Sequence, residues 1–118
     1  MLSTILSGTF LLQKPGLLAQ NQPLSFTDTT SATKFEGTND YTLSASQQNL
    51  QVGKGNLSAI KHYSIVADGD IYVKLNANDA VAQLGRVFVV MESSVTNIFI
   101  SNPSTDTEVN VSVTLAGV

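Results

Sequence analysis

The stretch that decides the fold spans residues 60–75 and reads Ile60-Lys61-His62-Tyr63-Ser64-Ile65-Val66-Ala67-Asp68-Gly69-Asp70-Ile71-Tyr72-Val73-Lys74-Leu75. Two runs rich in β-branched and aromatic residues flank the pair Asp68-Gly69. Aspartate tolerates a positive φ and glycine adopts one freely, as a tight turn between antiparallel strands requires. The pattern therefore predicts a β-hairpin, with strands over 60–66 and 71–75.

Three further strands are expected on the carboxyl side of this hairpin. Residues 86–91 form an almost continuous apolar run, which is typical of a strand covered on both faces. Residues 95–100 form the next strand, and the turn-rich segment 101–106 follows it. In the last strand, 109–115, apolar and polar residues alternate strictly, which predicts one buried face and one face that is exposed to solvent or lies in an interface. Its apolar positions are Val109, Val111, Val113 and Leu115.

The fold class follows from these short strands and the Gly, Pro and Asn turns between them. At 118 residues the chain is expected to form one domain, residues 1–118, with one core. We predict an all-β fold, an antiparallel β-sandwich of jelly-roll-like type with almost no helix. The main strand set is expected within residues 57–117.

The amino-terminal half is less regular. Residues 3–12 predict a strand, and residues 20–56 predict long loops that contain short strands at 24–27 and 41–45. The start lacks the basic residues that open a signal peptide, so the alternative of a cleaved leader is not favoured. Residues 1–21 carry eight large apolar residues but one charge, Lys14, and must be covered. We expect this segment to be an arm or edge strand, added to a sheet of its own subunit or of a neighbour.

Composition restricts the partners. The net charge is −3, and charged residues make up 13% of the chain, about half the usual share. The six cations are scattered, so no basic stripe for nucleic acid is present, and no apolar run reaches the roughly 18 residues of a membrane span. The 41 Ser, Thr, Asn and Gln residues give a surface that another subunit can bury without stranding ions. Both assembly and a mildly acidic secreted β domain fit this composition.

No pattern for catalysis, cofactor binding or a metal is found, so the sequence predicts a protein that is not an enzyme. His62 is the one histidine, cysteine is absent, and His62 is interpreted as structural. Oxygen groups at 68–70 and 76–79 are of the kind that bind calcium, but their spacing fits turns better than an EF-hand. A carbohydrate-binding module remains an alternative, with Tyr63 or Tyr72 as stacking platforms and calcium at Asp68, Asp70 and Asp79.

Residues 65–75, the segment 98–101 and the closing strand 109–113 with Ala116-Gly117 resemble small β-sandwich virion proteins of tailed bacteriophages. These are similar to capsid decoration or cement proteins and to some tail accessory proteins. The resemblance implies a non-enzymatic structural protein of the virion, often a homotrimer, that is assembled in the host cytoplasm. Its partners would be the major capsid protein or other virion proteins, and a tail or fibre component is the alternative within this class.

Overall fold

The structure is a computed structural model that describes the backbone of residues 2–14, 20–32, 34–90 and 93–118, and side chains from Asn39 onward within those ranges. The described residues form eight strands and no helix, which confirms the all-β prediction. The strands are β1 (Leu2–Lys14), β2 (Gln20–Ala32), β3 (Lys34–Leu43), β4 (Leu50–Gln51), β5 (Ile60–Leu75), β6 (Gln83–Val90), β7 (Ile98–Ser101) and β8 (Val109–Gly117).

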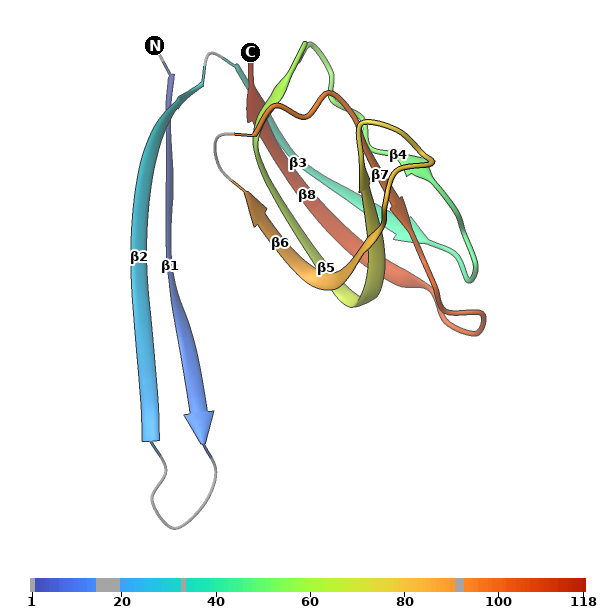
Figure 1. Ribbon diagram of the computed structural model, residues 1–118, viewed down its shortest axis with the longest axis horizontal. Helices are drawn as coiled ribbons and strands as arrows, with labels where there is room; N and C mark the ends of the chain where they lie inside the picture. Colours follow the sequence, from blue (N-terminus) through green and yellow to red (C-terminus); the bar gives the residue numbers. More distant parts are fainter. Residues whose placement is uncertain (1, 15–19, 33, 91–92) are drawn as a thin grey trace.

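All pairings between these strands are antiparallel, and they form two sheets. β1 and β2 pair with each other from Leu2↔Ala32 to Lys14↔Gln20. The other six strands form one sheet in the order β3-β8-β5-β7-β4, with β6 paired to the opposite edge of β5. Figure 1 shows this second sheet curled on itself, with β5 and β6 following the same curve.

The predicted hairpin at Asp68-Gly69 is wrong, because residues 60–75 form one continuous strand. The first half of β5 pairs with β8 and its last residues pair with β7, while both halves pair with β6. Asp68-Gly69 lies at the bend between the halves, where the register with β6 shifts between Val66 and Ile71. Among the described glycines only Gly55 has a positive φ, so Gly69 does not occupy the turn conformation that the sequence suggested.

Gly69 is instead required by a close approach. A Cβ atom at Gly69 would lie 3.1 Å from the Cγ2 atom of Val109, a core residue of β8. The missing side chain lets the bent strand pass close over its neighbour, as glycine in a strand often does.

We expect Gly69→Ala to destabilise the protein. Reducing the freedom of the unfolded chain gains about 0.4–1 kcal/mol, and crowding Val109 costs about 1–3 kcal/mol, so a net loss of about 1 kcal/mol is expected in urea denaturation. The matched control is Gly53→Ala, where a Cβ would meet only the Tyr41 hydroxyl at an ordinary 3.5 Å. Equal stability of the two variants would contradict the close-approach explanation.

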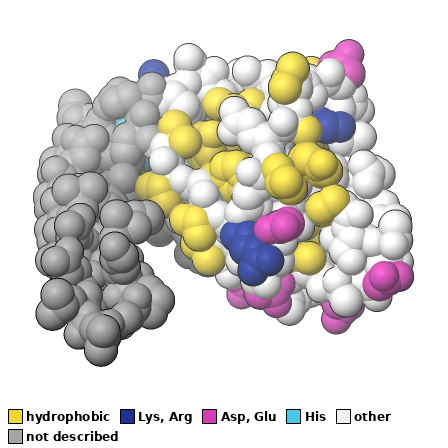
Figure 2. Space-filling view, turned by 60° about the horizontal axis from the view of Figure 1, so that its bottom comes forward, with side chains coloured by type: hydrophobic (Ala, Val, Ile, Leu, Met, Phe, Trp, Pro, Cys, Tyr) yellow, Lys and Arg dark blue, Asp and Glu magenta, His cyan; other side chains and the backbone are white. Residues whose placement is uncertain are grey.

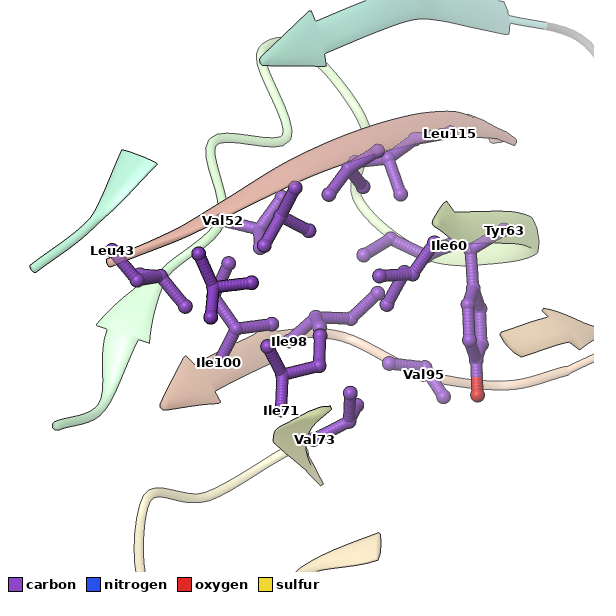
Figure 3. Packing of buried hydrophobic residues seen from close by; sticks show 14 of the residues in the cluster. Leu43, Val52, Ile60, Tyr63, Ile71, Val73, Val95, Ile98, Ile100 and Leu115 are labelled. Atoms are coloured by element: carbon purple, nitrogen blue, oxygen red, sulfur yellow. The ribbon is translucent and has the colours of Figure 1, made fainter. Parts of the chain in front are cut away.

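The core lies inside the curl. Figure 3 shows Leu115 of β8 and Ile98 of β7 pointing into the same space between the two halves of the sheet. This interior is one cluster of buried side chains. Its members are Leu43, Val52, Leu57, Ile60, Tyr63, Ile65, Ile71, Val73, Val95, Ile98, Ile100, Val109, Val111, Val113 and Leu115.

The alternation predicted for the last strand is confirmed. Val109, Val111, Val113 and Leu115 are at most 4% exposed, whereas Asn110 and Ser112 between them are exposed. The strand predicted over 95–100 overlaps β7, which begins three residues later, and Val95 forms an isolated bridge with Ile60.

The long loops predicted for residues 20–56 are largely wrong. Residues 20–32 form β2, and β3 extends the short strand expected at 41–45 toward the amino terminus. β3 pairs along β8 with a bulge between Phe35 and Gly37, so Leu43 joins the core although it lies outside the expected main strand set. The pair Pro15-Gly16 after Lys14 also predicts a turn in the sequence, but residues 15–19 lie outside the described residues.

A buried asparagine links two segments at one end of the curled sheet through its side-chain hydrogen bonds. Asn102 is 0% exposed, and its Nδ2 donates to the backbone oxygens of Leu43, Ser44 and Thr107 at 3.3, 3.1 and 2.8 Å. Its Oδ1 accepts the Ser104 N–H at 2.9 Å. One side chain therefore joins the end of β3 to the loop between β7 and β8.

Candidate functional site

The outer face of β5 and β6 carries a set of exposed large hydrophobic side chains, which we call the apolar face. Tyr72 lies opposite Leu84, and Val66 lies opposite Val87. Val89 continues the row on β6, beside Ser64 of β5. The exposed fractions are 48% for Val66, 37% for Tyr72, 58% for Leu84, 63% for Val87 and 42% for Val89. Figure 2 shows such a gathering of hydrophobic side chains on one face of the described sheet.

The sequence predicted that the strand at 86–91 is covered on both faces, but the described residues of this chain cover only one face of β6. Phe88 and Val90 pack partly buried against the core, but Val87 and Val89 face solvent. An apolar strand with one bare face is unusual for a free domain, since contiguous exposed apolar surface marks interaction sites.

One ion pair interrupts the apolar face. The Arg86 Nε donates to Asp70 Oδ1 at 2.8 Å, and the two side chains are 61% and 55% exposed. The hydrogen bond to Asp70, and then its charge, raise the pKa of Arg86. An ion pair this exposed adds little to stability, but it leaves the face without net charge.

A polar row made of β3 and β8 residues and of Asp68 on β5 borders the apolar face. The Asp68 carboxylate accepts the Asn110 N–H at 2.9 Å and its Nδ2–H at 3.0 Å, and the Thr42 hydroxyl donates to Asn110 Oδ1 at 3.0 Å. The Ser112 hydroxyl donates to Asp40 Oδ1 at 2.7 Å. These residues and Val66 line a shallow hollow of about 510 Å³, so the hollow and the apolar face share a border.

The pKa of Asp68 is held below its ordinary 3.8, first by the backbone N–H of Asn110 and next by its side chain. Because the folded-state pKa is lowered, the carboxylate contributes stability above pH 3.8 that is lost as the pH falls through the folded value. In Asn110→Ala the backbone donor stays. Carboxyl titration followed by NMR should therefore give an Asp68 pKa higher than in the wild type but still below ordinary. An unchanged pKa would contradict the side-chain contribution.

The residues singled out in the sequence are not brought together. His62 and Tyr63 are 4% and 5% exposed, next to a bulge in β5, so Tyr63 is not available as a stacking platform; burial also raises its pKa. Tyr72 is exposed. Asp70 pairs with Arg86, and no group of three or more His, Cys, Asp or Glu suited to a metal occurs among the described residues.

The apolar face was missed by sequence reasoning, although its signal was present in the run 86–91. The run indicates that both faces of the strand are apolar. It does not show which face is left uncovered by the rest of the chain. The described part of the chain contains no helix long and apolar enough to cross a membrane. Comparison with protein-family models, with curated proteins and with solved structures returned no match to this chain.

Proposed function

We propose that the chain is a structural subunit of a bacteriophage virion, a capsid decoration or cement protein that binds neighbouring subunits through the apolar face. The observation that carries the proposal is the row of five large hydrophobic side chains, each at least 37% exposed, on one face of a sheet. The low charge of the chain and the resemblance of its strand pattern to phage decoration proteins support the same conclusion.

The proposed mechanism is the burial of area at many repeated contacts. Each Å² of apolar surface removed from water contributes roughly 25 cal/mol, so modest contacts repeated over a lattice reinforce a shell. The proposed fold is the jelly-roll-like form of a β-sandwich, with the amino-terminal segment as an arm. The proposed partners are further copies of the chain, as a homotrimer, and the major capsid protein.

The test of the proposed location is quantitative mass spectrometry of purified virions. A number of copies per virion comparable to the number of equivalent positions on the capsid lattice supports a decoration protein. A few copies per particle would favour the alternative of a tail or fibre component, and absence of the chain would reject the virion role.

We expect the double variant Val87→Glu/Val89→Glu to lose its binding to other subunits while it stays folded. Both side chains face solvent, so the new carboxylates cost little in the free subunit, but burying them unpaired in a contact is expensive. Cosedimentation with capsids should fall at least tenfold, which corresponds to about 1.4 kcal/mol. The control is Val81→Glu, which lies in a loop and is 90% exposed. Equal loss in the control would contradict a specific role of the apolar face.

A carbohydrate-binding module is the second candidate, and the exposed Tyr72 together with the polar hollow beside Val66 favours it. An exposed aromatic ring supplies a stacking surface, and Asp and Asn side chains supply hydrogen bonds to sugar hydroxyls. A glycan array probed with and without calcium decides this candidate. No binding in either condition would reject it, and binding lost in Tyr72→Ala would support it.

A further inference from the structure

The six-stranded sheet has three strands with a free edge among the described residues, and two of these edges are protected against pairing. β3 carries Lys34, Glu36 and Asp40 and has a bulge between Phe35 and Gly37. β4 is only two residues long. Charges, bulges and short length are the means by which natural sheets prevent unwanted strand addition.

The third edge, β6, is the least protected of the three. It runs over eight residues, contains no proline and no lysine, and pairs only with β5 in the described sheet. Its one charged residue, Arg86, is held by Asp70 of the adjacent strand. Phe88 and Val90 on its inner face are only partly buried, so an additional strand along this edge would extend the core.

The amino-terminal hairpin of β1 and β2 likewise has one protected strand and one unprotected strand. β2 contains Pro23 and Asp28, whereas residues 2–13 of β1 contain neither proline nor charge and five leucine or isoleucine residues. β1 and β2 pair with each other and with no strand of the six-stranded sheet in the part of the chain described. A two-stranded hairpin is marginally stable alone in water, and a third strand or a packing partner is needed.

We propose that β1 of one copy pairs with the free edge of β6 in a second copy, so that the hairpin is exchanged between subunits. These two edges are the least protected ones of the described chain, and their only charged residues are Lys14, at the end of β1, and Arg86, which pairs with Asp70. The 13 residues of β1 are enough to cover the eight of β6. A charged partner strand would bury its charges against this edge, whereas residues 2–13 of β1 carry none.

The contact joins two different surfaces, an edge of the hairpin and an edge of the sheet. Such a heterologous contact closes into a ring when each subunit donates one hairpin and accepts another. The inference deepens the proposed assembly role and rests on it, because it names a second copy of the chain as the occupant of the β6 edge.

The test uses cross-linking of full-length protein, which contains no cysteine of its own. Ser7→Cys places a thiol at the middle of β1, and Val87→Cys places one on β6 at a side chain that is 63% exposed. The two single variants are refolded together and treated with a short flexible bismaleimide. Exchange predicts Ser7–Val87 cross-linked dimers, identified by peptide mass spectrometry, at a yield several-fold above a mixture with Thr105→Cys in place of Val87→Cys.

The double variant Ser7→Cys/Val87→Cys separates the alternatives. Exchange gives covalent oligomers, whereas pairing of β1 with β6 of its own chain gives only internally linked monomers and overturns the proposal. The proposal is also overturned if the mixture with Val87→Cys gives no more cross-linked dimer than the mixture with Thr105→Cys. Absence of the chain from virions would leave the cross-link intact and would reject only the virion role, so the two failures are distinguishable.

Discussion

Replacing Ile65 with alanine is expected to lower the free energy of unfolding by about 2–5 kcal/mol, the range measured for large-to-small changes in protein cores. Ile65 is 0% exposed and lies where β5 is paired on both sides, with Phe88 of β6 and with Val113 of β8. The neighbours are held in two ladders and can relax only partly into the space. The loss includes both the burial of the deleted atoms and the remaining cavity.

Urea denaturation followed by circular dichroism measures this loss. Val81→Ala is the control, because Val81 is 90% exposed and its truncation should change stability by less than about 0.5 kcal/mol. A loss below about 1 kcal/mol for Ile65→Ala would show that the interior of the curl is not packed as described.

Asn102→Asp is expected to cost about 3 kcal/mol or more at neutral pH, because it keeps the shape of the side chain and removes its donor. The amide nitrogen of Asn102 faces three backbone oxygens, and a carboxylate oxygen in its place would meet three acceptors while fully buried. The new carboxyl should have a pKa above its ordinary value, since burial and these oxygens disfavour the charged form. The variant should therefore regain stability relative to the wild type as the pH falls, because a protonated carboxyl donates again.

Denaturation curves at neutral and acidic pH check this expectation. The control, Asn78→Asp, changes an exposed asparagine and should be nearly neutral at both pH values. A variant at Asn102 whose deficit does not shrink at acidic pH would contradict the proposed arrangement of donors and acceptors.

Much of the carboxyl-terminal fold was predictable because its signals are local. The alternation from Val109 to Leu115 depends only on the two-residue period of a strand. The face of the sheet to which each side chain points follows from that period. The position of β7 follows from the apolar residues 98–100 and the turn cluster after them. These elements needed no knowledge of which strands are neighbours.

The bend at Asp68-Gly69 could not be told from a hairpin turn in the sequence. The pair allows a reversal, but whether 60–66 pairs with 71–75 or with β8 and β7 is decided by contacts distant in sequence. The proximity of Gly69 to Val109, which explains the glycine, exists only after β8 has paired with β5. Polar residues likewise concealed β2, where threonine and serine occupy positions on both faces.

The candidate site was only partly predictable for a related reason. Residues 86–91 indicated a strand that needs cover on both faces, and low charge indicated assembly. Which side chains are exposed to solvent depends on the curvature of the sheet. That curvature turns Phe88 toward the core and leaves Val87 and Val89 exposed. The protection of the β3 and β4 edges, and the bare edge of β6, also became visible only with the strand order.

The mass of the full-length protein in solution, measured by light scattering after size-exclusion chromatography, tests the central claim that this chain is an assembling subunit. A trimer is expected, with three times the 12.5 kDa mass of the chain. A protein that has the mass of a single chain at every concentration would contradict it.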